Sequence, residues 1–270
     1  MRMKDKVVII TGGTSGIGKA LAFEFGRHGS WVVITGRNAN DLKATAEELQ
    51  AAGIKALGIH ADVSLEDDNK RMAEETIRHF GRIDVLVNNA GISMRAAFED
   101  VRIEVIKKVM DINFYGALYA THYCLPEIVK NKGSIVGISS IAGYRGLPGR
   151  TGYSASKFAL NGFLEVLRTE YLKKGVHVLT ACPGFTSTNI RMRALLADGR
   201  EQKESPREES KEMTPEECAR HIYRATVKRK QIIILTLEGK LAVFFNKWWP
   251  WLADRLVFNA MAREANAPIK

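Results

Sequence analysis

Tyr153 and Lys157 lie four positions apart in the stretch YSASK, and together they have the chemistry needed to move a proton. Residues four apart on a helix share one face, so a helix would aim the phenol and the ammonium at the same point. A free phenol has a pKa of about 10, and a cation about 4–6 Å away in a partly dry site lowers it by roughly 1–3 units. The spacing therefore predicts a tyrosine poised for proton transfer, with a half-buried tyrosine beside a surface lysine as the alternative.

A second candidate site is the glycine-rich stretch TGGTSGIG, which follows a short apolar run and precedes an amphipathic one. Glycine lets the backbone turn tightly and approach a pyrophosphate, and the helix that follows presents free N–H groups to the anion. Because a strand and a helix flank the turn, we expect a dinucleotide site rather than an ordinary turn. Its predicted cofactor contacts are Gly12, Thr14, Ser15, Gly16, Ile17 and Gly18.

The choice of dinucleotide depends on the end of the second apolar run, ITGRN. NAD sites usually carry an acid there for the ribose 2′-hydroxyl, but Gly36 takes that position, Arg37 follows it, and Asp41 comes only at a helix start. A guanidinium favours a 2′-phosphate through charge-assisted hydrogen bonds, and Thr14 and Ser15 offer hydroxyls nearby. We therefore predict NADP(H) as the cofactor, with a solvated loop charge as the alternative for Arg37.

The framework for these stretches comes from short β-branched runs that alternate with longer amphipathic segments along the chain. Continuous apolar runs separated by helices are typical of a parallel sheet covered on both faces. The length of 270 residues fits one large α/β domain, so we predict a single doubly wound domain over residues 1–238. The expected helices span residues 17–28, 40–52, 66–80, 103–130, 153–173 and 214–229.

One segment after the sixth predicted strand departs from this alternation. Residues 191–213 contain DGREQKESPREESKE, a run rich in both charge signs. Loops of this length are usually lids or disordered segments. We therefore expect a solvated insertion there, with a substrate lid at about residues 190–213.

Composition narrows the function classes further. The formal net charge of +10 favours solubility, an anionic cofactor or an anionic membrane, and no basic run is interleaved with aromatics, so we expect no nucleic-acid partner. Cys124, Cys182 and Cys218 are scattered and the six histidines have no ligand spacing, so we expect neither a disulfide framework nor a metal site. The N-terminus shows no secretory signal, and we expect a cytoplasmic protein.

Seven stretches, in order, resemble the motifs of the short-chain dehydrogenase/reductase family: TGGTSGIG, ADV, NNAG, MDINFYG, GISS, YSASK and PGFTST, over about residues 5–237. The resemblance implies a Rossmann fold with a seven-stranded parallel sheet, in homodimers or homotetramers. It implies a catalytic set of Asn113, Ser140, Tyr153 and Lys157. It also implies cofactor contacts at Asp62, Val63, Asn89, Ala90, Gly91, Pro183, Gly184, Thr186 and Thr188, in addition to Tyr153 and Lys157.

With this resemblance, we predict an NADP-dependent oxidoreductase that reduces a ketone to a secondary alcohol by hydride transfer. Tyr153 would give a proton to the carbonyl oxygen and Ser140 would polarise it. Lys157 would tune Tyr153 and hold the nicotinamide ribose, and Asn113 would position a water behind Lys157. Ser140 rather than Ser139 matches the family, because it lies thirteen positions before Tyr153.

Residues 239–270 form an apolar and aromatic C-terminal extension that holds Trp248, Trp249 and Trp251. Lys247 and Pro250 interrupt its apolar run, and a membrane-spanning helix needs about 20 apolar residues, so we expect none here. Tryptophan flanked by Lys and Arg is typical of interfacial segments. Three roles stay open: packing against the core or another subunit, covering a lipophilic substrate, and peripheral membrane contact through residues 241–263.

The extension is loosely similar to that of the 3-ketodihydrosphingosine reductases and of the steroid or retinoid dehydrogenases within the family. This similarity implies a bulky apolar ketone, with a long-chain 3-keto lipid first and a 3-oxoacyl thioester or small carbonyl as the alternative. A non-catalytic protein that binds NADP(H) and docks on a membrane or partner is the hypothesis from another class. The complete set of Asn113, Ser140, Tyr153 and Lys157 argues against it.

Overall fold

The central sheet has seven parallel strands in the order β3-β2-β1-β4-β5-β6-β7. The strands are β1 (Val7–Ile10), β2 (Trp31–Gly36), β3 (Ala56–His60), β4 (Val85–Asn88), β5 (Ser134–Ile138), β6 (His177–Cys182) and β7 (Ile232–Ile234). The computed structural model describes residues 3–184, 186, 190–204 and 213–269. The predicted doubly wound α/β fold with a seven-stranded parallel sheet is confirmed.

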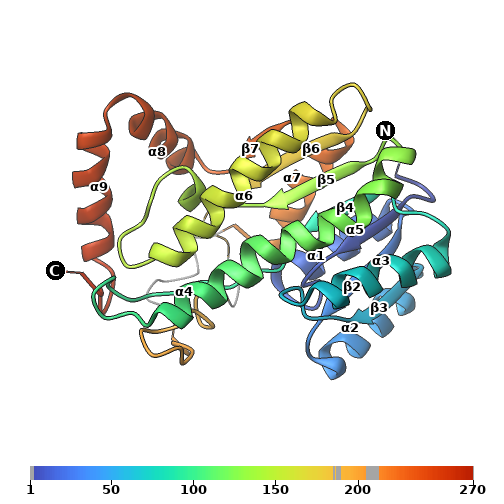
Figure 1. The fold of residues 1–270 in the computed structure, drawn as a ribbon, viewed down its shortest axis with the longest axis horizontal. Coiled ribbons are helices and arrows are strands. Elements are labelled where there is room, and N and C mark those ends of the chain that lie inside the picture. The colour runs from blue at the N-terminus through green and yellow to red at the C-terminus, as the bar shows by residue number, and fades with distance from the viewer. Residues whose placement is uncertain (1–2, 185, 187–189, 205–212, 270) are drawn as a thin grey trace.

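Helices cover both faces of this sheet (Figure 1). One face carries α1 (Gly16–Arg27), α2 (Ala39–Ala51) and α7 (Pro215–Val227), and the other carries α3 (Glu66–Phe80), α5 (Gly116–Lys130) and α6 (Thr151–Glu170). Each face of the sheet packs against its helices in a hydrophobic core. Strand β1 contributes side chains to both cores, because side chains alternate along a strand. Val8 and Ile10 join the core under α1 and α7, whereas Val7 and Ile9 join the core under α3, α5 and α6.

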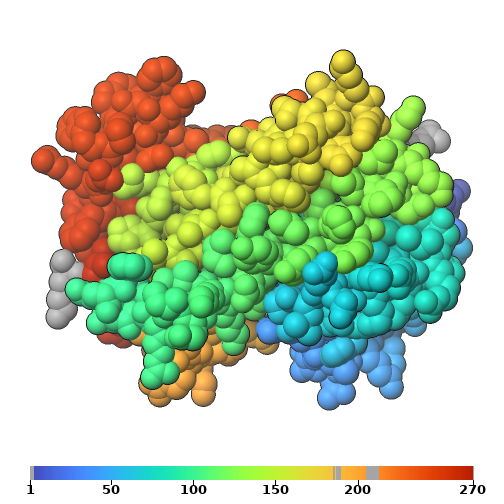
Figure 2. Space-filling model, in the orientation of Figure 1, coloured from blue at the N-terminus to red at the C-terminus, as the bar shows by residue number. Residues whose placement is uncertain are grey.

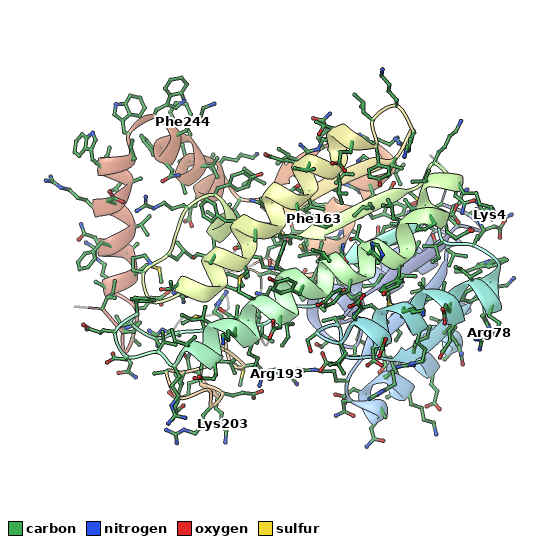
Figure 3. All side chains as sticks on the ribbon, in the orientation of Figure 1. Lys4, Arg78, Phe163, Arg193, Lys203 and Phe244 are labelled. Atoms are coloured by element: carbon green, nitrogen blue, oxygen red, sulfur yellow. The ribbon has the colours of Figure 1, made fainter. Side chains whose placement is uncertain are left out.

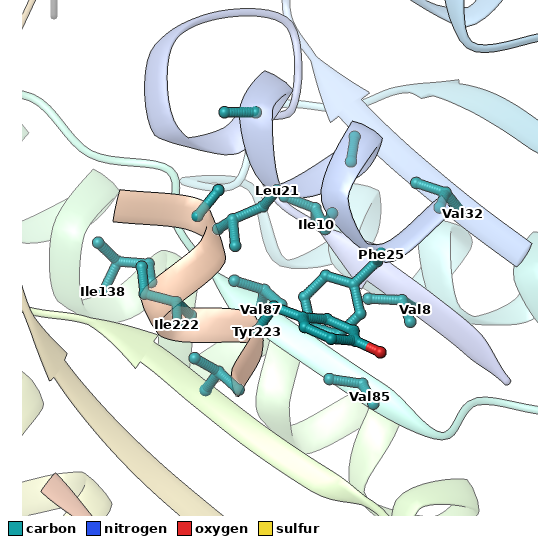
Figure 4. Packing of buried hydrophobic residues seen from close by; sticks show 14 of the residues in the cluster. Val8, Ile10, Leu21, Phe25, Val32, Val85, Val87, Ile138, Ile222 and Tyr223 are labelled. Carbon is teal, nitrogen blue, oxygen red and sulfur yellow. The ribbon is translucent and has the colours of Figure 1, made fainter. Parts of the chain in front are cut away.

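Figure 4 shows the first of these cores, where α1 packs against α7. Phe25 of α1 meets Tyr223 of α7 edge to face, with ring centroids 5.2 Å apart. Such aromatic pairs stabilise a core beyond the area that they bury. The packing therefore fixes α1, whose first residue, Gly16, belongs to the glycine-rich turn.

The helix predicted over residues 103–130 is continuous but contains a π-helical turn. Helix α4 (Ile103–Met110) runs through a π-turn at Asp111–Tyr115 directly into α5. Such turns inside α-helices frequently occur at functional sites. This one carries Asn113, which is 1% exposed.

The charged segment after β6 is only partly solvated. Within residues 190–204, Ala194 and Leu195 are buried, the N–H of Leu195 donates to the carbonyl of Ser93, and the N–H of Arg95 donates to the carbonyl of Leu195. The prediction of a solvated segment is therefore wrong for Ala194 and Leu195, which anchor the segment, whereas residues 198–204 are exposed or half-buried. The rest of the predicted lid, residues 205–212, lies outside the described residues.

Beyond β7 the chain forms two further helices, α8 (Leu237–Trp248) and α9 (Pro250–Ala262), which stand at one end of the molecule, away from most of the sheet (Figure 1). Thr236 caps α8 by accepting a hydrogen bond from the N–H of Gly239, and Pro250 opens α9, a position that suits proline. Helix α8 thus begins two residues before the predicted border. No helix in the described part of the chain has the length and hydropathy needed to cross a bilayer.

Candidate active site

The loops after β1 and β4 meet where the strand order reverses, which is the usual ligand site of doubly wound sheets. The Asn89 amide ties them together, because its Nδ2 donates to the carbonyl oxygens of Thr11 at 2.9 Å and Gly12 at 3.0 Å. The Thr11 hydroxyl accepts from the N–H groups of Asn89 and Ala90. The glycine-rich turn and the NNAG turn are therefore held in one fixed arrangement.

The glycine-rich turn leaves the N-terminus of α1 open to an anion. Gly12 and Gly16 have φ angles of +63° and +51°, a region that favours glycine, and a Cβ at Gly18 would clash with the Gly12 carbonyl. The N-cap residue Ser15 makes no side-chain capping hydrogen bond, and the first turn of α1 holds no acid. Free N–H groups at the positive end of the helix dipole fit the pyrophosphate of a dinucleotide.

One cavity of about 800 Å³ joins the predicted cofactor residues to the predicted catalytic residues. The predicted residues that line it are Gly12, Thr14, Ser15, Gly16, Ile17, Gly18, Arg37, Asp62, Val63, Asn89, Ala90, Gly91, Ser140, Tyr153, Lys157, Pro183, Gly184 and Thr186. Asn113 does not line the cavity, although its Oδ1 lies beside Gly91. Thr188 lies outside the described residues.

Tyr153, near the start of α6, lies beside the hydroxyl of Ser140, which follows β5 by two residues. Exclusion of water from the phenol raises the pKa of Tyr153, and the neighbouring Ser140 hydroxyl and the charge of Arg150 lower it only in part. The prediction that the pKa of the Tyr153 phenol is lowered is therefore wrong for the contacts that the protein itself makes. A raised pKa keeps the phenol protonated, which is the form that can give a proton to a carbonyl oxygen.

Lys157 is 4% exposed, and its Nζ donates to the carbonyl oxygen of Ile138 at 2.9 Å. The Nζ lies 5.7 Å from the centroid of the Tyr153 ring. Burial lowers the pKa of Lys157 to about 8, and the nearby Cys182 acts in the opposite direction. The ammonium thus lies near the ring of Tyr153 and is held by the backbone of β5.

Ser139 and Ser140 have different partners. The hydroxyl of Ser139 donates to Asn161 Oδ1 at 2.6 Å and is buried among structural groups. Ser140 instead lies beside Tyr153, and its Oγ accepts a hydrogen bond from the N–H of Ala142. Ser140 is therefore the serine whose hydroxyl stands beside the phenol.

Asn113 connects the π-turn to α6. Its Oδ1 accepts from the N–H of Ile92 at 2.8 Å, and its Nδ2 donates to the Ile92 carbonyl and to Ser156 Oγ, both at 2.9 Å. Ser156 Oγ in turn donates to the Tyr153 carbonyl at 2.8 Å. Asn113 therefore acts as a positioning residue, and its role in a water relay stays a prediction.

Arg37 lies at the corner of the cavity beyond β2, with one guanidinium nitrogen 3.8 Å from Asp62 Oδ2. Asp41 lines the same corner, because α2 begins at Ala39 and its first turn lies beside the cavity. The sequence predicted no acid at this corner of the cofactor site. Asp41 lies there, so that prediction is wrong. One cation and two carboxylates share this corner, so the preference for NADP(H) stays a prediction.

The opposite end of the cavity is built from apolar residues that the motifs did not identify. Helices α8 and α9 contribute Gly239, Ala242, Val257, Ala260 and Met261, with Glu238 as the one charged residue of these helices in the lining. Ile141, Leu147 and Leu195 add further apolar lining from other segments. The C-terminal extension therefore packs on its own chain and closes one end of the cavity.

A buried cluster of charges fastens the end of this extension. Glu264 Oε2 lies 3.2 Å from an Arg150 guanidinium nitrogen and 3.6 Å from one of Arg95. The three side chains are only 3–11% exposed. Arg150 lines the cavity and directly precedes α6, so the cluster joins the extension to the helix that carries Tyr153. The one sequence feature that could have pointed to this cluster is the position of Arg150, three residues before Tyr153.

Together with this geometry, comparisons with known proteins define the class: the chain belongs to the short-chain dehydrogenase/reductase family of oxidoreductases. A family model described as short chain dehydrogenase matches residues 6–198. The cradle at the start of α1 fits the nicotinamide dinucleotide that this class of oxidoreductase uses.

Two relatives and one solved structure illustrate the similarity. The chain is 35% identical over 271 residues to dehydrogenase/reductase SDR family member 7B of Xenopus tropicalis, covering 97% of this chain and 86% of that protein. It is 36% identical over 234 residues to 11-beta-hydroxysteroid dehydrogenase-like 4A of Arabidopsis thaliana, covering 86% of this chain and 77% of that protein. The fold matches a short chain dehydrogenase/reductase from Burkholderia phymatum in complex with NAD, with a TM-score of 0.84, 23% identity and coverage of 93% and 96%.

Proposed function

We propose that the protein reduces a bulky apolar ketone to a secondary alcohol with NADPH, and that a long-chain 3-keto lipid is the preferred substrate class. One observation carries the proposal: Tyr153 and Ser140 share a cavity whose other end is lined by apolar side chains of α8 and α9, such as Val257 and Met261. Apolar lining with a few convergent polar groups is typical of small-molecule sites. The hydroxysteroid dehydrogenase name of the Arabidopsis relatives supports an apolar substrate of this kind.

The chain's own residues would handle the proton and the charge. The bound nicotinamide supplies the hydride that the carbonyl carbon receives. Ser140 donates a hydrogen bond to the carbonyl oxygen, and Tyr153 transfers its phenolic proton to that oxygen, which completes the alcohol. The Lys157 ammonium stabilises the phenolate that remains until a proton from water restores the phenol. Asn113 keeps α6 and the NNAG turn in register during these steps.

The preference for NADPH rests on Arg37. Its guanidinium is 57% exposed in the side chain and lines the cavity, so it is available to a 2′-phosphate. A charge-assisted, two-pronged contact with phosphate is a strong and specific use of arginine. A ribose 2′-hydroxyl would gain much less from the same side chain.

A second candidate substrate is a 3-oxoacyl thioester. Three cations, Lys108 together with Arg191 and Arg193 of the lid segment, also line the cavity. Figure 3 shows Arg193 near the lower edge of the molecule, below α4. Phosphorylated carriers of acyl thioesters would complement these cations electrostatically. The apolar ketone ranks first because the apolar lining of α8 and α9 belongs to the same cavity as Tyr153 and Ser140.

The test is NADPH oxidation, followed optically, with a long-chain 3-keto amine, a 3-keto steroid, a 3-oxoacyl thioester and a sugar ketone. We expect turnover of the first two and little of the sugar. Turnover of the thioester alone would replace the proposed substrate class with the second candidate. Cofactor binding without turnover of any ketone would favour a non-catalytic binding protein.

A further inference from the structure

Helices α8 and α9 follow each other directly and form a helical hairpin. This hairpin carries many exposed apolar side chains, which we call its outer face. Its members are Leu237, Leu241, Phe244, Trp248, Trp249, Trp251, Leu256 and Phe258, which are 42–71% exposed. No other segment of similar length in the described chain gathers as many exposed large apolar side chains. Figure 2 shows the hairpin projecting from the body of the protein, and Figure 3 places Phe244 near its far end. Apolar patches of this kind mark interaction surfaces.

The side of the hairpin that faces the protein is held largely by polar contacts. Arg145 donates to Asn246 Oδ1 at 2.9 Å and pairs with Asp254, while Asn246 Nδ2 donates to the Tyr144 carbonyl at 2.9 Å. The only residues of α8 and α9 that are buried are Gly239, Ala253 and Met261. Surface helices normally turn their apolar side chains toward the core. Here most of the large ones point to solvent, so they serve something other than the chain's own folding.

The charges of the hairpin indicate what kind of surface its outer face binds. Lys240, Lys247, Arg255 and Arg263 are all exposed on it. The Lys247 ammonium lies 5.6 Å from the Trp248 ring centroid and the Arg255 guanidinium 5.7 Å from that of Trp251. Of the two acids on these helices, Asp254 is already paired with Arg145. Tryptophan beside basic side chains is the composition of segments that lie in a lipid interface, and basic residues are attracted to anionic headgroups.

We propose that the outer face of α8 and α9 docks on the surface of an anionic lipid bilayer. The opposite side of the same helices lines the cavity through Ala242 and Val257, so a docked protein holds one wall of its cavity against the lipid. Delivery of a lipid ketone by this route rests on the proposed function. The docking itself does not, because it depends on the outer face alone.

Co-sedimentation with vesicles of phosphatidylcholine and phosphatidylserine in equal parts tests the proposal without any substrate. We expect the wild-type protein to pellet with these vesicles, less with phosphatidylcholine alone, and less as salt is added. The triple variant Phe244→Ser, Trp248→Ser, Trp251→Ser should bind at least about tenfold more weakly, because it removes three interfacial aromatics. The matched control is Phe98→Ser, Leu172→Ser, whose side chains are each 67% exposed on other parts of the surface and should not matter.

Tryptophan emission gives a second readout in a Trp31→Phe background, where every remaining tryptophan lies on the hairpin. Vesicles should shift this emission to shorter wavelength. The absence of vesicle binding by the wild-type protein, or equal losses in variant and control, would overturn the proposal. So would sedimentation of a wild-type dimer that the triple variant converts to a monomer, because a second copy would then cover the outer face. An unchanged thermal shift on adding NADPH verifies that each variant is folded.

Discussion

Around the predicted catalytic residues, which we call the catalytic end, Asn113 and Lys157 are 1% and 4% exposed and hydrogen-bonded to backbone atoms, whereas α8 and α9 bury only Gly239, Ala253 and Met261. The catalytic end is held by buried hydrogen bonds between β4, β5, the π-turn and α6. The C-terminal end is held by arginines that reach across from other loops, above all Arg145 and Arg150.

This difference separates two tasks. Proton transfer requires donors fixed within a narrow geometry, and buried, fully partnered amides provide that rigidity. Substrate selection tolerates a wall with few buried apolar contacts, and such regions open locally at low free energy. We therefore expect changes at the catalytic end to abolish turnover, and changes at the C-terminal end to alter substrate preference and local opening.

Tyr153→Phe should produce the largest effect, a fall in kcat of about 10²–10⁴-fold, since it removes the proton donor. The dissociation constant for NADPH, measured by fluorescence, should stay within a few-fold of wild type because the ring is retained. Tyr115→Phe, a change at a tyrosine that is 42% exposed, is the control. Retained turnover in Tyr153→Phe would remove the tyrosine from the proposed mechanism.

Glu264→Gln tests the other end of the cavity. It leaves Arg95 and Arg150 buried without their carboxylate, and breaking such a buried pair costs about 3–5 kcal/mol. We expect faster hydrogen exchange across residues 237–269 and a higher KM for an apolar ketone, with NADPH affinity preserved. The exposed Glu170→Gln serves as the matched control. Equal weakening of cofactor binding would show that the two ends are not separate.

Lys157→Met should raise stability while it abolishes activity. The pKa of Lys157 falls from 10.5 to about 8 on folding, so the folded protein disfavours the ammonium at every pH below about 8. At pH 7 the methionine variant should gain about 3 kcal/mol in free energy of unfolding, less the lost hydrogen bond to Ile138. The wild type should recover this difference as the pH rises from about 8 to 10.5, because the unfolded chain then binds more protons than the folded one.

Denaturant unfolding of the cofactor-free protein at several pH values measures that difference. The exposed Lys173→Met, which removes a lysine without relieving burial, should show no such pH-dependent gain. A Lys157→Met variant that is less stable than wild type at pH 7 would mean that the packing around the ammonium stabilises the fold more than its burial opposes it.

Arg37→Ala should have the smallest effect of these changes, and only on one cofactor. Loss of a hydrogen bond to a charged group is worth about 1.5–3 kcal/mol, so the dissociation constant for NADPH should rise about 10–100-fold. That for NADH should change much less, and the exposed Arg78→Ala should change neither. Equal weakening of NADPH and NADH would assign Arg37 to the adenosine generally and remove the argument for NADP(H).

The sheet, its helices and the cofactor turn followed from local patterns. The apolar run Val7–Ile10 and the glycines at 12, 16 and 18 encode their structure within a few neighbouring residues. The YSASK spacing placed Tyr153 and Lys157 on one helix face. Such features can be predicted because they depend on short-range backbone geometry.

The features that the sequence did not predict depend on contacts between distant parts of the chain. Glu264 accepts a hydrogen bond from Arg150, which lies 114 residues away in the sequence, and no sequence periodicity predicts such a pair. Leu195 anchors a charged segment by pairing with the loop at Ser93. The pKa of Tyr153 moves upward because tertiary packing excludes water, an effect that the four-residue spacing to Lys157 does not contain.

The most direct test compares two ketones on one substitution in the apolar wall. Val257 of α9 lines the cavity. Among the described residues, the hydrogen bonds that hold Asn113 and Lys157 do not involve Val257. We expect Val257→Asp to lower kcat/KM for a long-chain 3-keto lipid at least about tenfold and to leave that for a small ketone nearly unchanged, with Val257→Leu as the control. Equal loss with both ketones, or no loss with the lipid, would contradict the assignment of α8 and α9 to the substrate wall.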